Sequence, residues 1–111
     1  MAHSDILKLE QSLSKCDLSI KAFEDAIEQE QNTIKEYREM ISDPNSSFPE
    51  ESLQNGIDRC KNNIKTFEKV IADEMNLKKD IRFKISKIEE KEEIIKLQEN
   101  SIQFDIETEE E

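Results

Sequence analysis

The chain has 111 residues, and its 16 Lys and Arg residues against 27 Asp and Glu residues give it a net charge of −11. Charged residues make up 39% of the sequence, against about 25% in an average globular domain, and this argues against a large spherical core. With one Gly, two Pro and no Trp, the sequence has few of the residues that β-turns and sheet edges use. We therefore expect an all-α fold, with residues 1–111 forming one elongated coiled-coil domain.

The negative charge also limits the expected partners. Proteins that bind nucleic acids or anionic membranes use Lys and Arg to neutralise phosphates, so we expect no direct binding to either. The longest run of consecutive apolar residues is 70–72. A membrane-spanning helix needs about 20 such residues and a signal peptide about 7 to 15. We therefore expect a cytoplasmic or nuclear protein.

The first predicted helix spans residues 4–42. Its apolar residues recur in alternating steps of three and four, which is the heptad repeat of a coiled coil. Ser4 is a suitable N-cap, and Pro44 ends the helix because proline disfavours the α conformation in the residue before it. The apolar seam consists of Ile6, Leu9, Leu13, Cys16, Ile20, Phe23, Ile27, Ile34, Tyr37 and Ile41.

A turn is predicted at residues 43–47 and a second helix from 48 to about 103. Ser47 and Glu50 have the spacing of a capping box, with Pro49 tolerated in the first turn. A break near residues 89–93 is allowed for, and residues 105–111 form an acidic tail. The second seam consists of Leu53, Ile57, Cys60, Ile64, Phe67, Ile71, Ile81, Ile85, Ile88 and Ile95.

Two long amphipathic helices joined by a short turn predict an antiparallel hairpin. The best register sets Ile34 opposite Cys60 and Glu30 opposite Ile64, and a slip of one heptad is the alternative. In this register the two cysteines, Cys16 and Cys60, lie roughly 27 Å apart along the hairpin. A disulfide needs Cα atoms within about 7 Å, so we expect both cysteines to be thiols.

The predicted second helix outruns the first by about 15 residues, given 1.5 Å of rise per residue in both. This apolar extension either folds back as a short third helix or enters a bundle with other chains. Further apolar residues lie off the seam, which is typical of helices in bundles of three or four. We therefore predict a partner interface made of Leu18, Val70, Met75, Leu77, Phe83, Ile94, Leu97, Ile102 and Phe104.

The sequence predicts neither an enzyme nor a metal or cofactor site. His3 is the single histidine and lies at the N-terminus, so no Cys–His pair or histidine cluster is available for catalysis or metal binding. The single glycine, Gly56, cannot form a glycine-rich phosphate loop, and we expect no small-molecule ligand. A basic strip either meets an acidic partner or is the solvated side of the coiled coil; it consists of Lys78, Lys79, Arg82, Lys84 and Lys87.

The layout of residues 53–98 resembles that of the small subunit of the spindle and kinetochore-associated complex. That family has an N-terminal helix, a polar turn and a second helix that bundles with helices of two sister subunits. The resemblance implies a structural subunit at kinetochores, with microtubule contact left to other subunits. It is carried by Ile57, Ile64, Phe67, Ile85 and the run Ile95-Lys96-Leu97-Gln98.

A second resemblance is to tubulin-binding cofactor A, a three-helix bundle of nearly equal size. It implies a soluble monomeric chaperone of β-tubulin whose tail closes the bundle internally. Our first expectation is a non-enzymatic coiled-coil subunit that assembles with other helical chains, different chains rather than copies of itself. The chaperone is the alternative.

Overall fold

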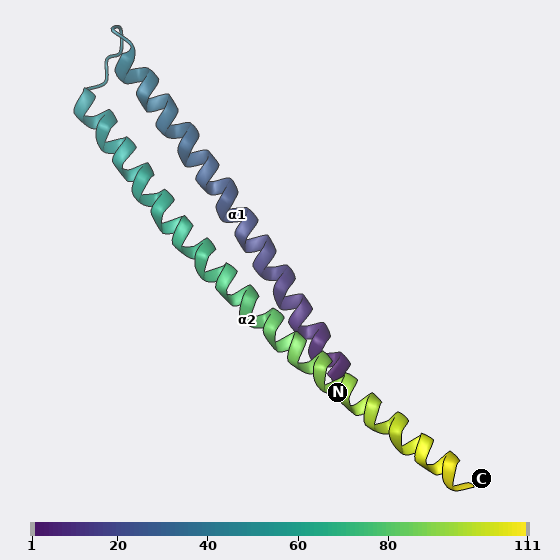
Figure 1. The fold of residues 1–111 in the computed structure, drawn as a ribbon. Helices are drawn as coiled ribbons and strands as arrows, with labels where there is room; N and C mark the ends of the chain where they lie inside the picture. The colour runs from purple at the N-terminus through teal and green to yellow at the C-terminus, as the bar shows by residue number, and fades with distance from the viewer. Residues whose placement is uncertain (1, 111) are drawn as a thin grey trace. The chain divides into compact units, whose positions relative to one another are not determined.

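A computed structural model describes the backbone of residues 2–110 and the side chains of residues 3–100. It contains two α-helices, α1 (Ala2–Ser42) and α2 (Glu50–Glu110), and residues 2–110 include no β-strand. The two helices form a hairpin (Figure 1). The fold is therefore all-α, as the composition predicts.

The connection between the helices is held by short backbone and side-chain hydrogen bonds. The Asp43 N–H donates to the Met40 carbonyl at 3.2 Å, which closes the end of α1. The Asp43 side chain then accepts a hydrogen bond from the Asn45 N–H at 2.9 Å, and its carbonyl accepts one from the Ser46 N–H at 3.1 Å. The pattern is an Asx turn, a conformation that Asp and Asn favour because their short side chains reach the backbone two residues on.

Helix α2 begins at Glu50, two residues later than predicted. The Pro49 carbonyl accepts the hydrogen bond from the Leu53 N–H at 3.2 Å, so Pro49 holds the capping position that precedes the helix. The Phe48 N–H donates instead to the Ser46 hydroxyl at 3.4 Å. Phe48 therefore belongs to the turn.

Helix α2 continues without a break through residues 89–93 and ends at Glu110. A short third helix that folds back on the hairpin is therefore not formed, and this alternative was wrong. Continuity is physically reasonable because no Gly or Pro occurs after Gly56 to interrupt the helix. The side chains of the acidic tail, residues 105–111, lie outside the described residues.

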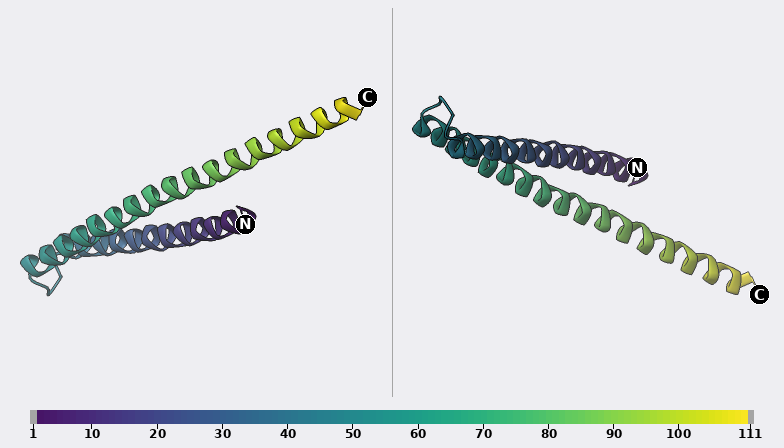
Figure 2. Two further views of the ribbon diagram at one scale, coloured as in Figure 1. Left: turned by 90° about the horizontal axis from the view of Figure 1, so that it is seen from below. Right: turned by 90° about the horizontal axis from the view of Figure 1, so that it is seen from above.

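The hairpin divides into two packing units, which we describe separately. The turn unit comprises Lys15–Leu77, and the terminal unit comprises Met1–Ser14 together with Lys78–Glu111. In the turn unit, α1 and α2 run antiparallel and side by side (Figure 1), and views at right angles show one helix in front of the other next to the turn (Figure 2).

The core of the turn unit is a cluster of buried seam residues. Ile34 on α1 packs with Ile57 and Cys60 on α2, and each of the three is at most 8% exposed. Half-buried Tyr37, Ile41 and Ile64 surround the cluster. The grouping of Ile34 with Cys60 excludes the alternative slip of one heptad, which would separate these residues by about 10 Å.

A second contact in the turn unit joins two aromatic rings. The Phe23 and Phe67 ring centroids lie 5.6 Å apart with 43° between the ring planes, which is a favourable tilted arrangement. The two helices also approach closely at Gly56, which is buried. A Cβ atom at Gly56 would lie only 2.8 Å from Cζ of the Tyr37 ring, so the absence of a side chain there makes room for the ring.

In the terminal unit the core is smaller. Ile81 on α2 is buried, while Leu13 on α1 and Ile85 and Ile88 on α2 are half-buried. Beyond Glu92 every described side chain of α2 is exposed. Among the residues of this unit whose side chains are described, apolar burial on α2 therefore ends at Ile88.

Candidate partner-binding surfaces

The residues of the predicted interface differ in exposure within the turn unit. Leu18 is 70% exposed, and Met75 and Leu77 are each 47% exposed, whereas Val70 is half-buried. Burying a Leu or Met side chain fully is worth about 1.5–3 kcal/mol, so solvent exposure of several such residues leaves binding free energy available.

The exposed apolar residues of the terminal unit lie on α2. Phe83 is 63% and Leu97 62% exposed, and Ile94 is also exposed. Ile102 and Phe104 belong to the same predicted set, but their side chains lie outside the described residues. Across both units, the further exposed large apolar residues, which were not assigned to the predicted interface, are Leu7, Met40, Phe48 and Ile95. Ile95 was assigned to the seam, but α1 does not reach far enough to cover it.

The predicted interface residues of the turn unit do not share one face. Val70 and Leu77 are seven residues apart and therefore lie on the same side of α2, beside Glu74, a charged residue at a seam position between Ile71 and Ile81. Met75 lies on the opposite side of that seam. Leu18 lies on the outer face of α1, since it is two residues from both buried Cys16 and buried Ile20.

The two sides of the turn-unit seam differ in charge. The residues that border the seam on one side are all uncharged, and most of those that border it on the other side are charged. We call the first side the low-charge flank; it consists of Ser19, Ala26, Thr33 and Met40 on α1 and Gly56, Asn63, Val70 and Leu77 on α2. The charged flank consists of Asp17, Glu24, Gln31 and Arg38 on α1 and Gln54, Lys61, Glu68 and Met75 on α2.

Inter-helix contacts identify the low-charge flank as the more closely packed side. Asn63 donates a hydrogen bond to Glu30 across the two helices, with 3.4 Å between Nδ2 and Oε1. Gly56 is buried beneath the Tyr37 ring. Ser19 and Ala26 are half-buried, whereas all members of the charged flank are exposed. The sequence already indicated that Ser19 and Ala26 border the seam, because they directly precede the seam residues Ile20 and Ile27.

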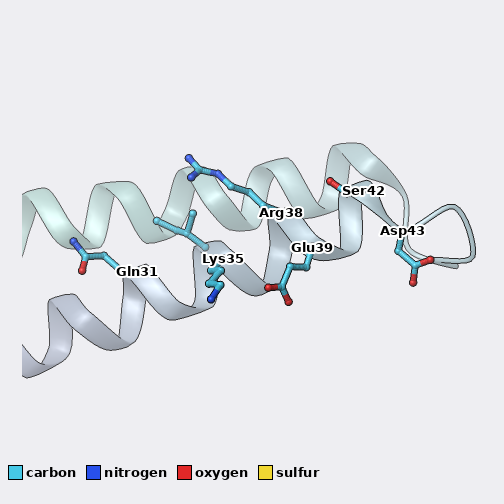
Figure 3. A pocket seen from close by; sticks show the side chains of 7 residues that line it. Gln31, Lys35, Arg38, Glu39, Ser42 and Asp43 are labelled. Atoms are coloured by element: carbon cyan, nitrogen blue, oxygen red, sulfur yellow. The ribbon is translucent and has the colours of Figure 1, made fainter.

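Shallow hollows occur on the charged flank near the turn. The larger one, about 490 Å³, runs along a single face of α1. Figure 3 shows the residues that line it following one another along that helix. Its rim carries both signs of charge, from Lys35 and Arg38 and from Glu39 and Asp43. A neighbouring hollow reaches α2 at Gln54, Ile57 and Lys61. Neither hollow is lined by a histidine or a cysteine.

The cysteines of the turn unit are buried thiols, and neither is in a disulfide, as predicted. Burial raises the pKa of the Cys60 thiol to about 11, with a further rise from the hydrogen bond to Glu30 and from the charge of Glu30, and a small opposing effect of Arg59. The thiolate is the reactive form of cysteine. Cys60 is therefore protonated and unreactive at neutral pH.

The basic strip of the terminal unit is solvent-exposed at Lys87. Its Nζ atom lies 3.5 Å from a Glu90 carboxylate oxygen and 5.3 Å from the centroid of the Phe83 ring. Both charged side chains are about 60% exposed, where such an ion pair contributes little. Lys87 thus has local partners in its own helix.

Two further site types were searched within the described residues. No group of three His, Cys, Asp or Glu side chains there comes together in a way that could hold a metal ion. Over the same part of the chain, neither helix has a stretch long and apolar enough to cross a membrane. Comparison with models of protein families, with curated proteins and with solved structures finds no match to this chain.

Proposed function

We propose that the chain is a non-enzymatic structural subunit that assembles with other helical chains through exposed apolar residues of the terminal unit. The observation that carries this proposal is the exposure of Phe83, Ile94, Ile95 and Leu97 on a continuous helix. Partner helices that bury such side chains would contribute about 1.5–3 kcal/mol for each residue. Large apolar patches on soluble proteins are typical of interaction surfaces.

The resemblance to the small subunit of the spindle and kinetochore-associated complex extends this proposal. We propose on this basis an assembly at the kinetochore or spindle, in the cytoplasm or nucleus, with different helical chains as the partners. The net charge of −11 agrees with a subunit that leaves nucleic acid and other acidic polymers to its partners.

The chaperone alternative has less support. A three-helix bundle of the tubulin-cofactor type needs a third helix packed on the hairpin, whereas α2 runs on to Glu110 as one helix. We therefore keep the structural subunit as the proposed function.

Affinity capture of the full chain from its native source, followed by mass spectrometry, tests the proposal. The Ile94→Glu/Leu97→Glu double variant is compared with Gln98→Glu, which adds the same kind of charge at an exposed polar position of the same segment. We expect helical partners to be lost with the double variant and kept with Gln98→Glu. Equal recovery of partners by the double variant would refute the proposed surface.

A further inference from the structure

We propose that the low-charge flank of the turn unit binds a second copy of this chain. In this two-fold symmetric pair, α1 of one copy lies against α2 of the other and both turns lie at the same end. The proposal goes beyond the function proposed above, which concerns the terminal unit and other chains. It also separates residues of the predicted interface, since it includes Val70 and Leu77 and leaves out Leu18 and Met75.

Charge is absent from one continuous side of the turn unit, the low-charge flank. In a sequence that is 39% charged, no member of the low-charge flank is charged, while the flank on the other side of the same seam is mostly charged. A coiled coil with two solvated sides usually places charged residues on both, because these positions form the polar border of the seam. An uncharged side is typical of a helix face that packs against further helices.

Side-chain size on the low-charge flank differs between the two helices. On α1 the flank is small at Ser19 and Ala26, whereas on α2 it carries the larger Val70 and Leu77. With Ile34 opposite Cys60, Val70 lies within two residues of the level of Ala26, and Leu77 within two residues of the level of Ser19, an offset of about 3 Å along the helices. A two-fold axis parallel to the helices keeps these levels, so the large residues of each copy meet the small residues of the other, as in well-packed helix pairs.

Residues of opposite charge border the low-charge flank on the two helices. Glu36 follows Thr33 by three residues on α1, and Arg59 follows Gly56 by three residues on α2, so both lie on the outer edge of the low-charge flank. They are at the same level of the hairpin. The two-fold axis therefore brings Glu36 of each copy towards Arg59 of the other, which gives two pairs of opposite charge.

These features favour a second copy over an unrelated helix as the occupant. A two-fold interface needs a surface that complements itself, and here one surface supplies both the small and large residues and both signs of charge. The net charge of −11 does not prevent the contact, since no member of the low-charge flank contributes to it. At physiological ionic strength, charges more than about 8 Å apart are largely screened.

Sedimentation equilibrium of the pure full chain tests the proposal. The measurement uses the Ile94→Glu/Leu97→Glu double variant, in which association through the terminal unit is removed. Any dimer that remains then reports on the low-charge flank alone, so this test is independent of the proposed function. In that background we expect a reversible dimer of the 13.0 kDa chain. A monomer at all concentrations up to about 200 μM would overturn the proposal.

The matched pair Leu77→Glu and Met75→Glu then locates the interface. Both residues are 47% exposed, and they lie on opposite flanks of α2. We expect Leu77→Glu to raise the dimer dissociation constant about 100-fold, since each copy would bury an unpaired carboxylate. Met75→Glu should change it less than about threefold. Equal effects of the two variants would overturn the assignment to the low-charge flank.

Charge exchange at the border tests the orientation without placing a charge inside the contact. Glu36→Arg and Arg59→Glu should each weaken the dimer about threefold to tenfold, because each creates like-charge pairs across the two-fold axis. The double exchange should restore the original affinity. If it weakens the dimer further, the two residues do not face each other and the proposed axis is wrong.

Discussion

Asn63 on α2 donates a hydrogen bond to Glu30 on α1, so a carboxylate within the apolar seam is held by the opposite helix. Glu30 also hydrogen-bonds Cys60, one of the most buried residues of the turn unit. The seam of this unit thus contains a polar cross-link beside the Ile34 cluster. Polar groups at seam positions lower stability and favour one register over others.

Replacing Glu30 with Leu should stabilise the hairpin. A half-buried carboxylate would be exchanged for an apolar residue that fits the seam, and exposed Asn63 could hydrogen-bond water instead. We expect the free energy of unfolding in urea to rise by about 1 kcal/mol. Glu28→Leu, at an exposed position of the same helix, is the control and should change it by less than about 0.5 kcal/mol. A loss of stability in Glu30→Leu would show that the hydrogen bonds outweigh the apolar gain.

The raised pKa of Cys60 predicts a loss of stability in alkaline solution. The folded pKa is about 11 against a model value of 9.0, so folding favours the protonated thiol. This contribution is complete below pH 9 and is lost as pH rises from about 9 through about 11. The difference in free energy of unfolding between the native chain and Cys60→Ala, measured in urea, should therefore shrink by about 2–3 kcal/mol over this range. Parallel pH curves of the two proteins would contradict the burial of an uncharged thiol.

Gly56→Ala should destabilise the hairpin although alanine is the better helix former. The gain in helix propensity is about 1 kcal/mol, but the new methyl group would lie 2.8 Å from the Tyr37 ring. Overpacking typically costs about 1–3 kcal/mol, so we expect a net loss of about 1 kcal/mol in thermal or urea unfolding.

The same substitution in a Tyr37→Leu background provides the control for this prediction. Without the ring, the added methyl group of Gly56→Ala should be neutral or stabilising by up to about 1 kcal/mol. If Gly56→Ala destabilises both backgrounds equally, the close approach of Tyr37 is not the reason for glycine at this position.

The ring pair of Phe23 and Phe67 should show a measurable coupling. A double-mutant cycle with Phe23→Leu and Phe67→Leu isolates the ring–ring interaction from the loss of apolar area. We expect a coupling free energy of about 0.5–1.5 kcal/mol in urea unfolding. The pair Phe23 and Phe48 is the control, because Phe48 lies in the turn and is exposed, and its coupling should be near zero.

Much of the fold follows from the spacing of apolar residues alone. Ile34 and Cys60 could be placed in one layer because alternating steps of three and four define a seam, and the short turn fixes its register. The start of α2 could not be placed as well, because Ser47 had the composition of a cap while Pro49 supplies the capping carbonyl. Local propensity does not decide between such neighbouring alternatives.

The candidate surfaces were predicted less completely. Phe83 was expected on the outer face of the second helix and Leu97 in its extension beyond the first helix, and both are exposed. Val70 was grouped with Met75 because both widen the apolar stripe, and only the helical geometry shows that they lie on opposite flanks. Glu30 was set opposite Ile64, but its long side chain reaches the nearby donors of Asn63 and Cys60. A carboxylate follows its hydrogen-bond donors rather than its seam position.

Hydrogen–deuterium exchange of the chain tests the proposed role in assembly most directly, measured once with the pure protein and once with the complex isolated from its native source. Our account predicts rapid exchange of the backbone amides of residues 93–100 in the pure protein, where every side chain is exposed, and slow exchange in the complex. Equal exchange rates for this segment in both samples would contradict the claim that other helical chains bind it.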